Sequence, residues 1–384
     1  MNIALISNLF PNCTAPTRGT FVMEKAQALR RLATVTVCAP VAHIPILRTK
    51  PPPREQAGDL TVLHAAYPAL PQALFQYRWR AYQRTLPGFF RRMPPPDVLL
   101  IDWLYPDAYA VMQFCRQTGR RIPIVITAHG ANAIGYYTRS SRSRFYIETL
   151  RKADCIIAVS SDMRNKILSM TGRAAGNIKV IGNGIDRTLF RPMPPREARA
   201  RLQLDPDQPL LLTIARLAPE KALHLLLRAL QLCQNRRAQL VIIGSGPRRR
   251  GLQGLVRRLQ LVDRVRFMGA LPREALPAWL AAADVFALSS LHEGDPVVIR
   301  EALACGTPVV APRVGGIPET VPDNRYGLLC EPNDSLQLAH ALDAAMERSW
   351  DRAAISRYGG SQTWDMVAER LFEICQSLTT IPRG

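Results

Sequence analysis

Short, wholly apolar runs recur along this chain of 384 residues, separated by longer segments whose apolar residues repeat at helical spacing. The runs are IALIS, TVTVCAP, DVLLI, PIVITA, CIIAVS and IKVI in the first half, and PLLLTIA, AQLVIIG, VRFMG, DVFALSS, PVVAP and GLLC in the second. Strands that are apolar throughout and alternate with helices are typical of parallel sheets covered on both faces. The pattern therefore predicts an α/β protein with two doubly wound halves in tandem.

The length of the chain also favours two domains, because a single hydrophobic core rarely grows this large. An Asn-Gly turn and a proline cluster between residues 183 and 200 mark the boundary. We expect an N-terminal domain at 1–185, a C-terminal domain at 186–360 and a last helix within 361–384 that packs back on the first domain. Because ligands of such sheets bind at the carboxyl ends of the strands, motifs at strand ends are the candidate sites.

The eight cysteines are far apart and form no Cys-x2-Cys pair, so we expect buried free thiols in a reducing compartment and no metal site. The opening MNIALISNLF fits a first core strand better than a signal peptide, and no apolar run approaches the roughly 18 residues of a membrane span. We expect a cytoplasmic protein without a bound cofactor.

Two glutamates, Glu293 and Glu301, have seven residues between them in HEGDPVVIREALACGTPVV. Asp295 precedes Pro296 as an N-cap precedes a proline at the first helical position. Glu293 is then in a loop, and Glu301 is about five residues into the helix, roughly 8 Å along its axis. The pair is too far apart for one acid/base dyad and marks two points on an elongated ligand.

The helix start between these glutamates favours a negatively charged group, because free N–H groups and the helix dipole meet there. A ligand with hydroxyls at both ends and phosphate in the middle is a sugar nucleotide. Glu301 would accept hydrogen bonds from its ribose, and Glu293 from the hydroxyls of its sugar.

Two further motifs suit the same ligand. In TIARLAPEKALHLLLRAL, Arg216 follows a strand and Lys221 begins an amphipathic helix, so that both cations could neutralise a diphosphate leaving group. In VIIGSGP, Gly244 and Gly246 would let a base or ribose approach the backbone. Arg249 stands at the third glycine position of the dinucleotide fingerprint, which disfavours a nicotinamide cofactor.

Taken together, these motifs with ALACGTPVVA and VGGIPE resemble the donor-binding domain of the retaining glycosyltransferases of family 4. The N-terminal half resembles the same family in FPNCTAPTRGTFVMEKAQAL, DWLYPDAYA, VITAHGAN, IIAVSSDM and VIGNGID. The likeness spans essentially the whole chain, and the Glu-x7-Glu segment is its most specific part. It implies the GT-B fold, in which two Rossmann-like domains face each other across a cleft.

The resemblance also implies residue roles. Arg216 and Lys221 would bind the diphosphate and Glu301 the ribose. Glu293, with the backbone of Asp295, Pro296 and Val297, would hold the donor sugar. His129 would face the anomeric carbon from the other domain, and Gly19 would let the first loop pass close to the diphosphate.

Members of the family transfer sugar with retained configuration and without a bound metal, and the leaving phosphate oxygen is thought to take the acceptor proton. Three positions depart from the family pattern. Asn132 stands where Asp is frequent, Asp295 replaces an aromatic or apolar residue, and Arg300 precedes Glu301 where an apolar residue is frequent. These departures leave the identity of the donor sugar open.

The charge is strongly basic, with a formal net charge of +20, and residues 1–185 hold 24 Lys+Arg against 9 Asp+Glu. Segment 74–92, LFQYRWRAYQRTLPGFFRR, interleaves arginines with aromatic residues, and a second basic run covers 139–152. Such segments suit an anionic membrane surface. They also suit stacking on single-stranded nucleic acid, or a half-buried helix whose aromatics belong to the core.

The leading hypothesis is a glycosyltransferase on the inner face of the cell membrane, extending a polyprenyl-diphosphate-linked glycan of a cell-surface polysaccharide. The donor would be a UDP-sugar or GDP-mannose, and no nucleic acid is expected as partner. The candidate membrane or acceptor residues are Arg78, Trp79, Arg80, Arg91 and Arg92. The alternatives are an epimerase or hydrolase of the same fold, a basic nucleic-acid-binding protein and a silent partner subunit.

Overall fold

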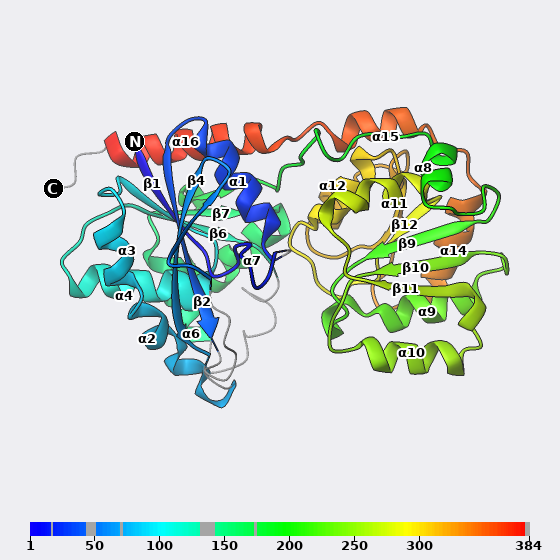
Figure 1. Ribbon diagram of the computed structural model, residues 1–384, viewed down its shortest axis with the longest axis horizontal. Helices are drawn as coiled ribbons and strands as arrows, with labels where there is room; N and C mark the ends of the chain where they lie inside the picture. The colour runs from blue at the N-terminus through cyan, green and yellow to red at the C-terminus, as the bar shows by residue number, and fades with distance from the viewer. Residues whose placement is uncertain (17, 44–50, 70–71, 131–142, 173–174, 381–384) are drawn as a thin grey trace. The chain divides into compact units, whose positions relative to one another are not determined.

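The computed structural model describes residues 1–16, 18–43, 51–69, 72–130, 143–172 and 175–380. It divides into two compact units, coloured along the chain in Figure 1. Unit 1 comprises Met1–Asn183 and Trp364–Gly384, and unit 2 comprises Gly184–Thr363. The chain thus leaves unit 1 after Asn183 and returns to it at Trp364. The two ends of unit 2 lie side by side, since Ile185 pairs with Thr363 and its N–H donates to the Gln362 carbonyl at 3.0 Å.

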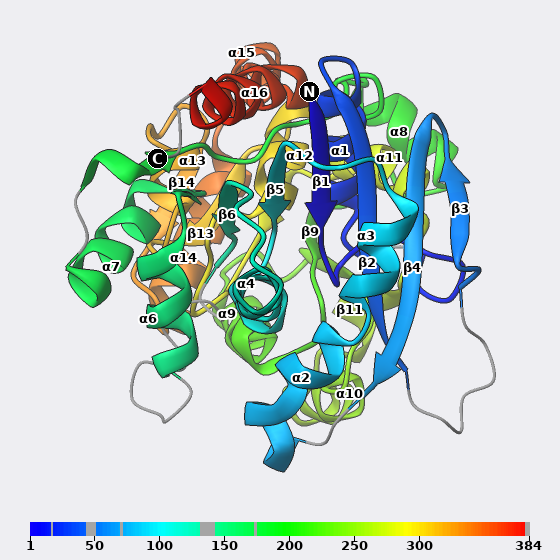
Figure 2. The ribbon, with the colours of Figure 1, turned by 90° about the vertical axis from the view of Figure 1, so that its left-hand side faces the viewer.

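The described strands of unit 1 form an eight-stranded sheet in the order β3-β4-β2-β1-β5-β6-β7-β8. All neighbours are parallel except β3 and β4, which form an antiparallel hairpin at the edge of the sheet (Figure 2). Leu5 of β1 pairs with Val37 of β2 on one side and Leu100 of β5 on the other. The strands are β1 (Asn2–Ile6), β2 (Thr34–His43), β3 (Arg54–Ala57), β4 (Leu60–Pro68), β5 (Val98–Ile101), β6 (Ile124–Ala128), β7 (Cys155–Ala158) and β8 (Ile178–Val180).

Two apolar layers hold the helices of unit 1 on its sheet. One face packs against α2 (Arg78–Gln83), α3 (Leu86–Arg92), α4 (Tyr109–Gln117), α6 (Ser143–Lys152) and α7 (Ser161–Thr171). The other face packs against α1 (Thr20–Arg30) and α16 (Trp364–Thr380), which lie beside each other (Figure 1). The indole N–H of Trp364 donates to the Glu24 carboxylate at 2.9 Å. The last helix therefore completes the core of unit 1.

Unit 2 contains a six-stranded sheet, parallel throughout its described strands, in the order β11-β10-β9-β12-β13-β14. Renumbered along the chain, this is the order 3-2-1-4-5-6 of the Rossmann fold, and β4-β2-β1-β5-β6-β7 of unit 1 repeats it. The strands are β9 (Leu210–Ile214), β10 (Gln239–Ile243), β11 (Val265–Gly269), β12 (Val285–Ala287), β13 (Val309–Pro312) and β14 (Gly327–Cys330).

The helices of unit 2 also form two layers. One face of the sheet carries α8 (Pro195–Arg201), α11 (Leu276–Ala282), α12 (Val297–Ala304), α13 (Ile317–Thr320) and α15 (Arg352–Gly359). The other carries α9 (Leu223–Leu232), α10 (Arg249–Arg258) and α14 (Ser335–Glu347). The Asp334 side chain caps α14 by accepting from the N–H groups of Leu336 and Gln337.

The α/β fold with two Rossmann-like units confirms the prediction from the apolar runs, and each of the twelve runs contains a strand. The β3–β4 hairpin is additional. Its signal was the two-residue Gly58–Asp59 connection, in which Gly58 has a φ of 62°. Seven of the eight cysteines are buried free thiols, but Cys13 is exposed, contrary to the expectation for all eight. Among the described helices, none combines the length and the apolarity needed to cross a bilayer.

Candidate active site

The order of strands in unit 2 reverses between β9 and β12, which is where ligands of open α/β sheets bind. The segment after β9 leads to α9 on one face, and the segment after β12 leads to α12 on the other. Lys221, at the end of the short helix η4 (Pro219–Lys221), forms an ion pair with Glu293, which follows β12. Both side chains are largely buried. Two of the sequence-predicted residues therefore meet at this switch point.

Backbone contacts hold the two segments together. The Leu291 N–H donates to the Glu220 carbonyl at 2.9 Å, and the Ser289 hydroxyl donates to the Lys221 carbonyl at 3.0 Å. A Cβ atom at Gly315 would overlap the carbonyl oxygen of Glu293 at 1.8 Å, and Gly315 has a φ of 56°. Only glycine fits there, so Glu293 is supported from both sides.

Arg216 follows β9 and forms an ion pair with Glu220 on the same segment. Its side chain is 62% exposed, in contrast to Lys221 at 22%. The guanidinium group is therefore free to reorient towards a ligand at little cost, since exposed ion pairs are worth about 1 kcal/mol or less.

Gly244 and Gly246 begin the segment after β10, and their φ values are 138° and 159°. A Cβ atom at Gly244 would lie 1.9 Å from the Ala215 carbonyl oxygen, and one at Gly246 would lie 2.4 Å from that of Leu217. Glycine is therefore required at both positions by the packing of the backbone itself, in addition to any approach of a ligand. They let the segment after β10 pack against the backbone that carries Arg216.

Glu301 lies on α12, buried, with Oε1 3.1 Å from the Arg273 guanidinium group. Burial raises the pKa of Glu301, and the positive charge of Arg273 opposes that rise. Arg273, in the short helix η6 (Arg273–Ala275), also stacks over the Phe190 ring at 4.9 Å. Sequence reasoning missed Arg273, because no local pattern links it to Glu301.

Asp295 does not cap α12, as the sequence had suggested. The helix begins at Val297, after Pro296, and the buried Asp295 carboxylate instead accepts from Thr320 at 3.1 Å and from Arg300 at 3.3 Å. Asp295 and Arg300, two departures from the family pattern, thus compensate each other.

In unit 1 the switch point lies between β1 and β5, and a buried network is found there. Asp102, directly after β5, forms an ion pair with Lys25 of α1, and its Oδ1 lies 3.1 Å from Nε2 of His129, just after β6. Burial tends to raise the pKa of Asp102, but Lys25 and His129 outweigh it and hold this pKa at about 2. The His129 ring also packs edge-on against Phe21 at 5.0 Å. His129 is therefore fixed by a carboxylate and a lysine that sequence reasoning had not assigned.

Asp107, fully buried near the same switch point, accepts from the Asn8 N–H at 2.7 Å and from the Tyr82 hydroxyl at 2.9 Å. Burial raises the pKa of Asp107 to about 7, despite these two donors.

Gly19, the N-cap of α1, has a φ of 74°, and a Cβ atom there would overlap the Leu9 carbonyl oxygen. Gly19 therefore lets the end of the first loop pack against the backbone of Leu9.

Segment 74–92 is divided between the core and the surface. Phe75, Tyr82 and Phe89 are buried in unit 1, as expected if the aromatic residues of this segment belong to the core. Tyr77 is 43% exposed and Arg80 stacks over its ring, while Trp79 is half-buried. These surface aromatics border a pocket of about 370 Å³ that also includes Tyr109, Arg144 and Glu148.

The arginines of this segment differ in the same way. Arg80 and Arg91 are exposed. Arg78 is half-buried over the Phe75 ring, and Arg92 donates to the carbonyl groups of Gly88 and Pro53 at 3.0 and 3.2 Å. Of the second basic run, residues 139–142 lie outside the described residues, as does Asn132.

Comparison with known proteins agrees with this architecture. Residues 19–189 match the family described as Glycosyltransferase Family 4, and residues 195–362 match Glycosyl transferases group 1. The D-inositol 3-phosphate glycosyltransferase of Nocardia farcinica is 30% identical over 320 residues, covering 77% of this chain and 68% of the relative. The chain belongs to the group 1, family 4 glycosyltransferases.

Other relatives are matched over a shorter span. The D-inositol 3-phosphate glycosyltransferase of Thermomonospora curvata is 33% identical over 243 residues, or 58% of this chain and 56% of the relative. The matched region thus spans little more than half the length of that relative.

Solved structures share the GT-B fold. Sucrose-phosphate synthase of Thermosynechococcus elongatus superposes with a TM-score of 0.83 at 24% identity, covering 98% of this chain and 99% of that one. Anabaena HepE in complex with UDP-glucose has a TM-score of 0.74 at 20% identity, covering 98% and 100%.

Proposed function

We propose that the protein transfers a hexose from a nucleotide-diphosphate sugar, with retention of configuration, to a lipid-linked glycan. The observation that carries this proposal is the Lys221–Glu293 ion pair at the switch point of unit 2, with Arg216 on the same segment. A buried carboxylate that loses its cation needs new hydrogen-bond donors. The diphosphate would displace Glu293 from Lys221 and leave the carboxylate to accept from the sugar hydroxyls.

The other residues take the roles that the family resemblance implies. Glu301, oriented by Arg273, would accept from the ribose. The backbone from Asp295 to Val297, at the start of α12, would contact the donor sugar. Arg216 and Lys221 would stabilise the charge that develops on the leaving diphosphate.

Unit 1 would supply the acceptor side. His129, held by Asp102 and Lys25, would act at the anomeric centre, and Gly19 would shape the loop beside the diphosphate. No residue of the described site is needed as the base, because the leaving phosphate oxygen would take the proton of the acceptor hydroxyl on the same face of the sugar.

The lipid-linked acceptor is proposed from the basic surface of unit 1. Exposed Arg80 and Arg91, with Tyr77 and Trp79, combine guanidinium groups with amphipathic rings, which suits lipid headgroups. We propose that this surface brings the protein to the inner face of the cell membrane, where a polyprenyl-diphosphate-linked glycan is the acceptor.

A thermal-shift panel of UDP- and GDP-sugars on the full chain tests the donor. A donor at about 100 times its Kd adds roughly 2.7 kcal/mol to the stability of the state that binds it. UDP-glucose, which Anabaena HepE binds, and GDP-mannose are the first donors to compare. If no nucleotide sugar raises the melting temperature, the donor assignment is wrong.

Turnover of the donor then tests transfer against hydrolysis. We expect consumption of the donor to require an acceptor, either a lipid-linked glycan or the soluble D-inositol 3-phosphate named for the curated relatives. The anomeric configuration of the product, read by NMR, should be that of the donor. Consumption at the same rate without any acceptor would instead assign a hydrolase.

A further inference from the structure

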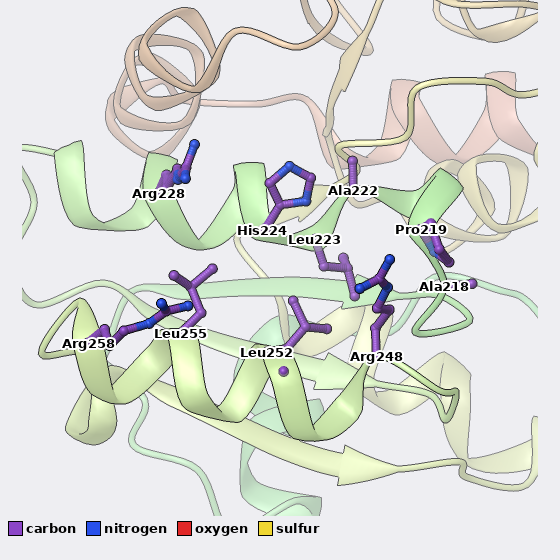
Figure 3. A pocket seen from close by; sticks show the side chains of 11 residues that line it. Ala218, Pro219, Ala222, Leu223, His224, Arg228, Arg248, Leu252, Leu255 and Arg258 are labelled. Atoms are coloured by element: carbon purple, nitrogen blue, oxygen red, sulfur yellow. The ribbon is translucent and has the colours of Figure 1, made fainter.

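A groove of about 410 Å³ lies on unit 2 between α9 and α10 (Figure 3). Its apolar part is formed by Leu223 of α9 and by Leu252 and Leu255, which project from α10 into the space between the two helices. Gly251 of α10 also lines the groove, and a Cβ atom added there would meet nothing within 4 Å. The groove is therefore open at this position.

The rim of the groove is cationic. Arg228 stands on α9, as does His224, while Arg248 directly precedes α10 and Arg258 ends it. The groove lining contains no carboxylate, and none of these three guanidinium groups has an ion-pair partner within the described part of the chain. Burial lowers the pKa of His224, and the charges of Arg228 and Arg248 lower it further, as expected where positive charge is not compensated.

This situation differs from that of two more buried arginines in unit 2. Arg199 pairs with Asp284 at 2.7 Å, and Arg300 pairs with Asp295 at 3.3 Å. Three arginines line one groove without counter-charges, so their positive charges repel one another, and an anion bound among them would reduce that repulsion. The groove thus lacks the carboxylate partner that Arg199 and Arg300 have.

The chemistry of the lining defines the occupant. Guanidinium groups match phosphate oxygens in geometry and charge, and the leucines require an apolar part. The volume is that of a small-molecule site, since such pockets span roughly 300–1,000 Å³. We propose that the groove between α9 and α10 binds a small, soluble, phosphate-bearing molecule with an apolar body.

The position of the groove relates it to the candidate active site. Ala218, Pro219 and Ala222 line it, and they flank Lys221 in the chain. A ligand in the groove would therefore contact the same segment that carries Lys221 and Arg216. This proposal does not depend on the proposed sugar transfer, because its test measures only the binding of a ligand to the groove.

The test is calorimetric titration of the full chain with phenyl phosphate at low ionic strength. Replacing Arg228, Arg248 and Arg258 together with Gln should weaken binding roughly 30-fold or more, because charge-assisted hydrogen bonds are lost. The matched control replaces Arg249, Arg250 and Arg257, which lie on α10 outside the groove, and has the same change in net charge. We expect the control to bind as the wild type does.

A second variant keeps every charge. Gly251→Leu should fill the open groove and abolish binding, while the melting temperature stays constant or rises, because leucine favours the helix. The double variant Arg216→Ala/Lys221→Ala should still bind phenyl phosphate, which separates the groove from the candidate active site.

Three outcomes would overturn the proposal. If phenyl phosphate binds equally weakly to both triple variants, its binding depends on the overall positive charge and not on a defined site. Loss of binding in Arg216→Ala/Lys221→Ala alone would place the phosphate at the active site. Sedimentation with anionic vesicles that depends on the three groove arginines, without binding of phenyl phosphate, would assign the groove to a membrane surface.

Discussion

Lys221 and Glu293 form an ion pair although 72 residues separate them in the chain, because they follow the two neighbouring strands at which the order of the sheet reverses. The two charges thus neutralise each other before any ligand arrives. Under the proposed function, a diphosphate would compete with Glu293 for Lys221, which would link binding and release of the leaving group to the position of a carboxylate.

Changing Arg216 or Lys221 to Ala should lower turnover roughly 100-fold, and more than it lowers donor affinity, because charge on the leaving diphosphate is greatest in the transition state. Steady-state kinetics with calorimetry separates the two effects. The control is Arg201→Ala, which removes a surface ion pair of the same i,i+4 spacing, with Glu197. Unaltered turnover at saturating donor in both variants would exclude the leaving-group role.

Glu301→Gln should weaken binding of free nucleotide and of nucleotide sugar equally, because both contain the ribose. The loss of one charge-assisted hydrogen bond corresponds to roughly 1.5–3 kcal/mol. Glu274→Gln, at an exposed position next to Arg273, is the control. Calorimetry that finds both affinities unchanged in Glu301→Gln would remove this residue from the ribose site.

Lys25→Met should destabilise the protein by about 3–5 kcal/mol in urea unfolding, because it leaves the buried Asp102 carboxylate without its lysine. Lys152→Met, which breaks the exposed pair with Glu148, should cost less than about 1 kcal/mol. The second change Asp102→Leu should restore part of the lost stability. Equal, small effects of the two lysine variants would mean that the buried pair contributes no more than a surface pair.

Asp107→Asn should stabilise the protein more at about pH 8 than at about pH 4.5. With its pKa raised to about 7, Asp107 holds a proton in the folded state that the unfolded chain loses near pH 4. Stability from this group therefore falls as the pH rises from about 4 to 7. Asparagine can still accept from Asn8 and Tyr82 but does not ionise.

Thermal melts of Asp107→Asn and wild type across this range provide the measurement. Each kcal/mol gained should raise the melting temperature by roughly 2–4 °C for a unit of this size. A difference between the two proteins that does not change with pH would show that Asp107 has an ordinary pKa.

Replacing Arg80 and Arg91 with Ser should weaken sedimentation with anionic liposomes roughly 30-fold at low salt, since each arginine near such a surface contributes about 1 kcal/mol. These two are chosen because Arg92 is engaged with backbone carbonyl groups and Arg78 is half-buried. The control replaces the exposed Arg116 and Arg121 of the same unit. Equal loss in both variants would point to net charge alone, and salt-sensitive binding to oligonucleotides without lipid binding would favour the nucleic-acid alternative.

The strands could be predicted because parallel strands buried on both faces must be apolar along their whole length, and IALIS or PLLLTIA has no other interpretation of equal weight. The positions of Arg216, Lys221 and Glu293 after strands follow from the same pattern. The partners of the site residues could not be predicted. Lys25 and Asp102 lie 77 residues apart, and only the order of strands in the folded sheet brings them together.

Asp295 shows a second limit. An Asp-Pro step before a helical pattern is a common N-cap signal, but the local rule cannot anticipate Thr320 and Arg300, which compete for the same carboxylate. Likewise, the sequence does not reveal that a Cβ atom at Gly244 or Gly246 would overlap neighbouring backbone carbonyl groups. The donor-binding role of these two glycines stays a prediction.

The pairing of Ile185 with Thr363 gives unit 2 the topology of a cassette, with its entry and exit joined by a hydrogen bond. Recombination between relatives could exchange it as one uninterrupted stretch of gene without breaking any strand of the larger sheet. A frameshift or stop codon after Thr363 would remove α16 although unit 2 ends at that residue. Because α16 packs in the core of unit 1, such a truncation would destabilise the amino-terminal unit and leave unit 2 complete.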